Sequence, residues 1–186
     1  MRIHWILAAT SALALTACGD DGVVEDPSDP DQIAAAADRL AKPQPGQYRM
    51  TAELVEFSAP GATEEEQAML DMMYQPGTQQ TNTFCLTEEE AEEGFSEFVT
   101  AMDDIPDECE FTDFTAADNS LDATMSCDDG GGNTGNISFD GTLSETGSDM
   151  TMTMDMTSGA DSRSMRMVMR NTSERIGECT GEEAAG

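Results

Sequence analysis

The sequence predicts one α+β domain: a single twisted, mostly antiparallel sheet, a meander of about six to seven strands, with two inserted helices packed on its apolar face. Three consecutive segments alternate apolar and polar residues with a period of two, as strands do when one face of a sheet is dry and the other wet. Their apolar positions are Ile137, Phe139, Gly141 and Leu143, then Met150, Met152, Met154 and Met156, then Met165, Met167 and Met169. Methionine is therefore expected to cover most of the dry face.

Residues 1–17 are predicted to be a signal peptide. Arg2 precedes an apolar run from Trp5 to Leu15, which is too short to span a bilayer. The residues Leu15-Thr16-Ala17-Cys18 then resemble the lipobox of bacterial lipoproteins. The resemblance implies that Cys18 becomes the first mature residue and carries a diacylglyceryl thioether and an N-acyl group, whose chains would hold the protein on a membrane. The alternative is an ordinary signal peptide with a chance cysteine.

The composition excludes several classes of function. Residues 1–17 contain one arginine and no acid, so their removal takes the formal charge from −30 to −31, and so acidic a chain repels nucleic acid. The single histidine, His4, is lost with the signal, which leaves no imidazole for a Ser-His-Asp or Cys-His mechanism or for a His-ligated metal. The single lysine, Lys42, lies outside the predicted domain, so a Ser-Lys catalytic pair is not expected. We therefore expect no catalytic residue, no metal and no cofactor other than the lipid on Cys18.

The segment 18–42 is predicted to be the lipidated cysteine and an acidic, disordered linker. Within it, the residues from Gln32 to Ala41 have the pattern of a short helix after Pro30, with Ile33, Ala36, Ala37 and Leu40 on one side. We expect a solvated spacer with a transient helical turn rather than a docked helix, because short helices are marginal in water.

The domain is predicted to span residues 43–180. It opens with a strand whose alternation starts at Tyr48 and changes phase near Leu54, which indicates a bulge. A helix of residues 64–74 follows, because Thr63 and Glu66 form a capping box before an apolar side of Met69, Leu70, Met72 and Met73.

A second strand and a second helix are predicted next. The strand runs over residues 78–86 and leads directly to a capping box formed by Thr87 and Glu90. Ala91, Phe95, Phe98 and Met102 then recur at helical spacing, so we expect this helix to cover the sheet.

Four cysteines are predicted to form two disulfides. If Asp118 is the centre of a hairpin turn, Cys109 faces Cys127, Phe111 faces Met125 and Thr115 faces Leu121. Cross-strand partners lie about 4.5 to 5.5 Å apart, which is within reach of a disulfide. By elimination, Cys85 pairs with Cys179, as an oxidising compartment permits.

The residues that follow the hairpin, 128–133, resemble a calcium loop only in composition. Their oxygen ligands lack the alternating spacing of an EF-hand, so we expect a glycine-rich connection rather than a metal site. Residues 181–186 are expected to be an acidic tail.

Several landmarks occur in an order that resembles a known family. They are Lys42 to Thr51, Phe84-Cys85-Leu86-Thr87, Cys109, Cys127, Gly141, the methionine-rich strands and Arg175-Ile176-Gly177-Glu178-Cys179. Together they resemble the domain-of-unknown-function family 3617, whose members are secreted or lipid-anchored proteins of Gram-negative bacteria. The resemblance covers about residues 43–179 and implies a periplasmic antiparallel sheet with helical insertions. It implies no activity, substrate or catalytic residue.

The leading functional interpretation is a monomeric, non-enzymatic binding or scaffolding module that is lipid-anchored in the envelope and faces the periplasm. Gly19 rather than an aspartate follows Cys18, which by resemblance to lipoprotein sorting favours the outer over the inner membrane. Its expected partners are the membrane, through the anchor, and a hydrophobic ligand or an envelope protein. A methionine-lined groove on a curved sheet would suit such a ligand. The candidate lining is Phe98, Phe139, Met150, Met152, Met154, Met165, Met167 and Met169.

Three alternatives stay open. The candidate lining can simply be a closed core, because periodicity does not distinguish a core from a cavity. Thioethers can bind Cu(I) or consume oxidants, although no histidine or free cysteine would assist them here. A hydrolase using paired carboxylates is the third alternative, and no pair of acids stands out for that role.

Overall fold

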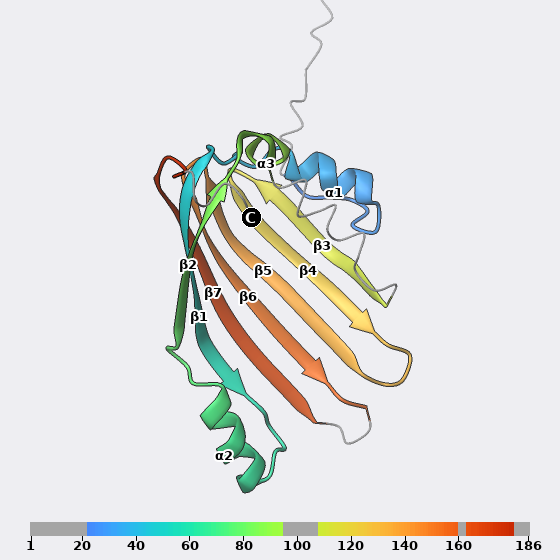
Figure 1. The fold of residues 1–186 in the computed structure, drawn as a ribbon. Coiled ribbons are helices and arrows are strands. Elements are labelled where there is room, and N and C mark those ends of the chain that lie inside the picture. The colour runs from blue at the N-terminus through green and yellow to red at the C-terminus, as the bar shows by residue number, and fades with distance from the viewer. Residues whose placement is uncertain (1–21, 95–107, 160–162, 181–186) are drawn as a thin grey trace, which may run out of the picture.

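The computed structural model describes residues 22–94, 108–159 and 163–180 (Figure 1). Within these ranges, seven strands form one open antiparallel sheet with the order β2-β1-β7-β6-β5-β4-β3, which confirms the predicted antiparallel sheet. The strands are β1 (Gly46–Ser58), β2 (Gln79–Leu86), β3 (Cys109–Ala117), β4 (Ser120–Asp128), β5 (Thr134–Ser144), β6 (Gly147–Thr157) and β7 (Ser164–Gly177), and the helices are α1 (Pro30–Ala37), α2 (Glu64–Met73) and α3 (Glu88–Glu93). Strands β3 to β7 form the meander, and β1 and β2 extend it beyond β7.

The strand register places the methionines of β6 and β7 on one face. Three pairs face each other directly across these strands: Met152 and Met169, Met154 and Met167, and Met156 and Met165. On the other side of β6, Ile137 lies opposite Met154 and Phe139 opposite Met152. The prediction that methionine covers most of one face is therefore confirmed, but Met156 on this face is 49% exposed, so the face is not dry along its whole length.

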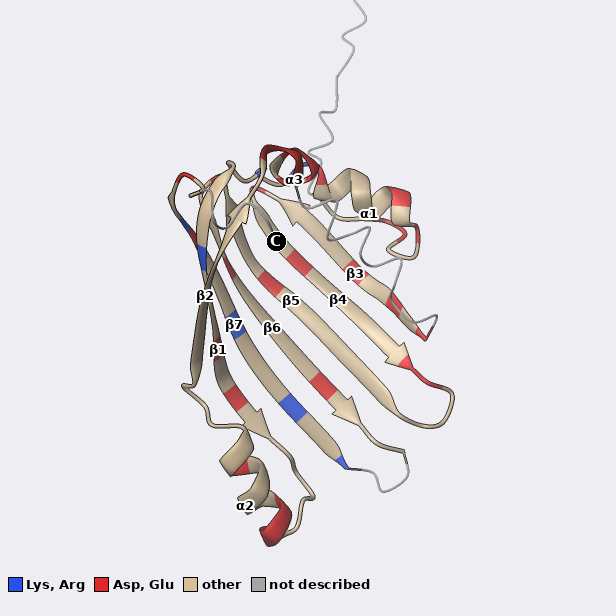
Figure 2. Cartoon of the chain, in the orientation of Figure 1, with Lys and Arg blue, Asp and Glu red and all other residues tan. Residues whose placement is uncertain are grey.

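The opposite face of the sheet is polar. Arg170 on β7 pairs with Asp149 on β6, and Arg166 pairs with Asp155 on β6 and with Glu56 on β1. Figure 2 shows this pattern as basic residues on β7 beside acidic residues on the adjacent strands. These ion pairs are about half exposed, so each contributes little to stability, but they exclude this face from a core.

The β3–β4 hairpin has the predicted disulfide but not the predicted turn. Cys109 faces Cys127 and Phe111 faces Met125, as expected, whereas Leu121 faces Ala116 rather than Thr115. Asp118 and Asn119 both have positive φ, of 50° and 62°, which is the two-residue turn that suits a right-handed hairpin. A register shift between Phe111 and Asp113 compensates, so the prediction that Asp118 alone is the centre of the turn is wrong.

The other predicted irregularity and the second disulfide are confirmed. The pairing of β1 with β7 shifts between Leu54 and Glu56, which is the bulge expected near Leu54. Cys85, at the end of β2, is bonded to Cys179, which follows β7, with Cα atoms 5.5 Å apart. Since β1 lies between β2 and β7, this disulfide ties together three strands.

The segment predicted to be a disordered linker is packed on the sheet from Gly22 onward. Val24 N–H donates to the Phe114 carbonyl at 2.9 Å, and Val23 forms a bridge with Thr115 on β3. Helix α1 is capped by the Asp29 side chain and begins at Pro30. The expectation of a solvated spacer is therefore wrong for residues 22–40, because tertiary packing stabilises a helix that is too short to persist alone.

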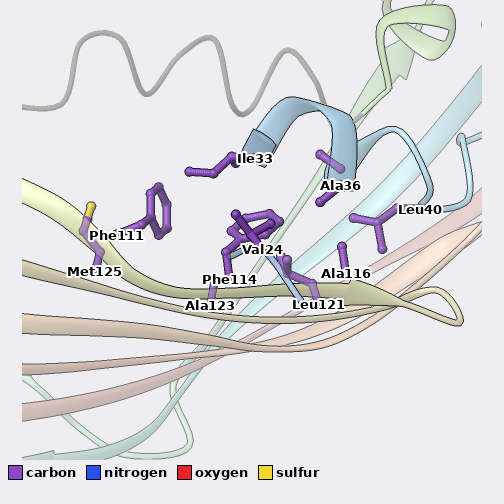
Figure 3. Close-up of a cluster of buried hydrophobic side chains, with 11 residues drawn as sticks. Val24, Ile33, Ala36, Leu40, Phe111, Phe114, Ala116, Leu121, Ala123 and Met125 are labelled. Carbon is purple, nitrogen blue, oxygen red and sulfur yellow. The ribbon is translucent and has the colours of Figure 1, made fainter. Parts of the chain in front are cut away.

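Helix α1 covers the β3–β4 end of the apolar face and builds the hydrophobic core there. Ile33 and Leu40 are each 4% exposed, and they face Phe114 and Leu121, which are each 2% exposed (Figure 3). The rings of Phe111 and Phe114 meet edge to face at 5.8 Å. The complete cluster is Val24, Ile33, Ala36, Ala37, Leu40, Phe111, Phe114, Ala116, Leu121, Ala123 and Met125.

The expectation that the two inserted helices pack on the apolar face is not confirmed. Of the ten residues of α2, all of which the structure describes, none is buried, and Met72 is 76% exposed. Helix α3 has six residues, of which Ala91 is buried. Its expected continuation, with Phe95, Phe98 and Met102, lies outside the described residues. Figure 1 shows α1 and α3 at one end of the sheet and α2 at the other.

Candidate functional site

A cavity of about 750 Å³ lies at the α2 end of the sheet. The apolar face forms one side of it, through Ile137, Met156 and Met165 and the disulfide of Cys109 and Cys127. The segment between β1 and α2, together with α2 itself, forms the other side, through Ala59, Pro60, Ala62, Met69 and Leu70. We call this cavity the α2 pocket.

Two contacts hold α2 beside the sheet. The Arg163 Nη1 atom lies 2.6 Å from the Glu66 Oε1 atom and so joins the first turn of α2 to the connection between β6 and β7. At the other end of the helix, the rings of Phe57 on β1 and Tyr74 stack with centroids 4.4 Å apart. The pocket wall therefore depends on a surface ion pair and one aromatic pair rather than on burial of the helix.

Glu66 is the most strongly perturbed acid of the pocket. Its carboxylate accepts a hydrogen bond from the Thr63 backbone N–H at 2.8 Å, and the Glu66 backbone N–H donates to the Thr63 hydroxyl oxygen at 3.3 Å, as the predicted capping box requires. The Thr63 hydroxyl also donates to the carboxylate at 2.8 Å. The bonds that the carboxylate accepts from Thr63, followed by the one from Arg163, lower the pKa of Glu66 from an ordinary 4.5 to about 2. Glu66 therefore carries a negative charge throughout the neutral range.

A second acid of the pocket, Asp129, holds the connection between β4 and β5. Its carboxylate accepts bonds from the Asn133 side chain, from the Gly131 N–H at 2.8 Å and from the Asn133 N–H at 3.0 Å, and these bonds lower its pKa. The described residues contain no group of three or more His, Cys, Asp and Glu side chains placed to hold a metal ion. The oxygen atoms of Asp129 accept these three hydrogen bonds from the loop.

The predicted lining residues divide into four groups. Met165 alone lines the α2 pocket, whereas Met152, Met154, Met167 and Met169 lie half-buried on the same face. Phe139 and Met150 pack against the core cluster beneath α1, and Phe98 lies outside the described residues.

Sequence reasoning missed several residues of the pocket. Ile137 and Met156 belong to the alternating strands, and Met69 and Leu70 to the apolar side of a predicted helix, so the signals were present. What the pattern lacks is the path of the chain between β1 and α2, which decides where that helix lies.

A smaller cavity of about 180 Å³ lies at the opposite end of the sheet. Tyr48, Phe84, Leu86 and Leu143 line it together with Ala41, Pro43, Gly94, Ser144, Gly147, Ser148 and Ser173. Tyr48 is 2% exposed, and its hydroxyl lies 2.8 Å from the Gln44 carbonyl and 3.2 Å from that of Glu145. Burial raises the pKa of Tyr48, so this hydroxyl stays protonated and acts as a structural donor.

Residues 43–179 match the model of DUF3617, described as a protein of unknown function. The chain belongs to the DUF3617 family. The resemblance found in the sequence landmarks is thereby confirmed, and with it the extent of the match. No curated protein matches the sequence, and no solved structure matches it either. In the part of the chain that the structure describes, no helix has the length and apolar character needed to cross a membrane.

Proposed function

We propose that this DUF3617 protein is a lipid-anchored envelope protein that binds the hydrocarbon chain of an amphiphile in the α2 pocket. The observation that carries the proposal is a cavity of about 750 Å³ with a predominantly apolar lining, open on a sheet face that continues as methionine. This volume falls within the range of about 300 to 1,000 Å³ that is usual for small-molecule sites. An apolar chain suits it because most of the exposed lining surface is apolar.

The methionine side chains suit a pocket that accepts ligands of different shapes. Methionine is unbranched and has three rotatable bonds, so it adapts to different apolar partners. Each methylene moved from water into the pocket contributes about 0.8 kcal/mol, so a chain of about ten methylenes contributes about 8 kcal/mol toward a cost of association of about 4 to 15 kcal/mol. Long chains should therefore bind more tightly than short ones.

The anchored, periplasm-facing location is part of the proposal. It rests on the lipobox-like residues that end at Cys18, which lie outside the described residues, and on two disulfides, which an oxidising compartment permits. A lipid on Cys18 would keep the pocket close to a membrane that supplies amphiphiles. Labelling with a radioactive fatty acid, compared with a Cys18→Ala variant, tests the anchor.

The binding experiment uses a neutral fluorescent fatty-chain probe. We expect saturable binding, and we expect the double variant Met156→Gln/Met165→Gln to bind about tenfold more weakly because it places two amides in the lining. The matched control is Met72→Gln/Met73→Gln, which changes two exposed methionines of α2 that do not line the pocket. Binding that does not saturate, or equal loss in both double variants, would contradict the proposal.

A second candidate function is Cu(I) binding, and the strand register favours it. Three methionine pairs face each other across β6 and β7, where Cβ atoms of opposed residues lie about 4.5 to 5.5 Å apart. Flexible side chains at that spacing bring two or more thioethers, which are good Cu(I) ligands, to one ion. Titration against a competing chelator tests this: Met154→Leu/Met167→Leu should weaken Cu(I) binding, and Met72→Leu/Met73→Leu should not.

A further inference from the structure

We infer that the α2 pocket accepts amphiphiles with an uncharged or cationic head group and disfavours those with an anionic one. The inference deepens the proposed function and rests on it. It follows from the charged residues that line the pocket, from their partners and from their positions on opposite sides of the cavity.

The charged side chains of the lining are three acids and one base: Glu66, Glu108, Asp129 and Arg163. Glu66 belongs to α2, whereas Glu108 precedes β3 and Asp129 follows β4. Acids therefore flank the pocket from both the helix and the sheet. Figure 2 shows the acidic first turn of α2 on the helix side.

The one basic residue of the lining, Arg163, is already engaged by an acid and is not available to bind an anionic head group. The Arg163 guanidinium lies 2.6 Å from the Glu66 carboxylate, and both side chains are close to half exposed. An anionic head group could reach Arg163 only by competing with a carboxylate that is already in contact. The pair is therefore close to neutral as seen by a ligand.

The remaining two acids determine the sign of the charge at the pocket. Glu108 and Asp129 lie beside the disulfide of Cys109 and Cys127, which forms part of the apolar lining. Asp129 keeps its charge because it accepts two backbone N–H groups and a side-chain amide. A chain inserted against the disulfide places its head group near these two carboxylates, where an anion is repelled and a cation attracted.

The experiment compares three twelve-carbon ligands that differ only in the head group: dodecylamine, dodecanol and laurate. Each competes with the neutral fluorescent probe at pH 7.5 and below its own aggregation concentration. We expect the amine to bind at least about tenfold more tightly than laurate, with the alcohol between them. Raising the salt from 0.05 to 0.5 M should reduce that ratio, because it shortens the screening length.

Matched variants separate the local acids from the overall charge of the protein. Glu108→Gln/Asp129→Asn removes two charges at the pocket, and Asp122→Asn/Asp140→Asn removes two from the polar face, where these residues oppose each other on β4 and β5. We expect the first variant to lower the amine-to-laurate ratio severalfold and the second to leave it nearly unchanged.

Two outcomes would overturn the inference: laurate binding as tightly as dodecylamine, or the same change of ratio in both variants. The second outcome would mean that net charge alone sets the preference. If none of the three ligands displaces the probe, or the probe itself does not saturate, the proposed binding function fails and the inference fails with it.

Discussion

The two ends of the apolar face have the same sequence pattern and different surroundings. At the β3–β4 end, α1 covers the sheet and Phe114, Ala116 and Leu121 are at most 2% exposed. At the β6–β7 end, Met156 is 49% exposed and the neighbouring methionines are half-buried among the described residues. Alternation therefore predicts which face is apolar, whereas a separate segment, here α1, decides where that face becomes a core.

The largest expected effect is at the covered end. Phe114→Ala removes a ring that is 2% exposed and contacts Phe111, so we expect a loss of about 3 to 5 kcal/mol in the free energy of unfolding. Met154→Ala, at the open end, should cost less than half as much because its side chain is already partly in water. Urea denaturation measures both, and equal losses would show that the two ends are packed alike.

The second prediction concerns the helix that makes the difference. Ile33→Ala should cost about 2 to 4 kcal/mol, since Ile33 is 4% exposed against the cluster beneath α1. The neighbouring exposed position Asp31→Ala serves as the control and should cost about 1 kcal/mol or less. A near-zero effect of Ile33→Ala on the free energy of unfolding would contradict the docking of α1 on the sheet and favour a transient helical turn.

The third prediction concerns pH at the open end. The pKa of Glu66 is lowered to about 2 in the folded protein from an ordinary 4.5, so its stabilising contribution is present above pH 4.5 and is lost as the pH falls from about 4.5 to about 2. Glu66→Gln keeps the capping box but removes the charge. The stability difference between the wild type and this variant should shrink over that range. A stability difference that is the same at pH 6 and pH 2.5 would contradict the lowered pKa of Glu66.

The smallest expected effect on stability comes from oxidation. Mild hydrogen peroxide should convert Met72, Met73, Met69 and Met156, which are 49 to 76% exposed, to sulfoxides before Met125, which is 8% exposed. The free energy of unfolding should change by about 0.5 kcal/mol or less, because these side chains contribute little burial. Peptide mass spectrometry gives the order of oxidation. Early oxidation of Met125 would mean that the covered end opens readily.

Much of the sheet could be predicted because its signals are local. The alternation of Ile137 and Phe139 with polar residues, and of the methionines after them, assigns the apolar face directly. Cys109 and Cys127 face each other as predicted, but they do so because the register shift between Phe111 and Asp113 offsets the two-residue turn. Even so, the hairpin bulge escaped prediction, because no residue near Thr112 marks it in the sequence.

Two features that depend on distant contacts, the packing of α1 and the α2 pocket, could not be predicted. The stripe of Ile33, Ala36 and Leu40 lies in an acidic, proline-containing segment whose composition favours disorder. The surface that orders it is formed by β3 and β4, much later in the chain. The same limit applies to the α2 pocket. The capping box of Thr63 and Glu66 predicts the helix, but the ion pair of Glu66 with Arg163 that helps to place it joins residues 97 positions apart.

The central claim is that the methionine-lined end of the sheet is an open binding surface and the other end a closed core. The most direct measurement is a nuclear magnetic resonance titration of carbon-13 methyl-labelled methionine with dodecanol. We expect saturable shifts of the methyl signals of Met69, Met156 and Met165, whose side chains line the α2 pocket, while the signal of Met125 in the cluster beneath α1 stays in place. Equal shifts of all these signals, or shifts of Met125 alone, would contradict this claim.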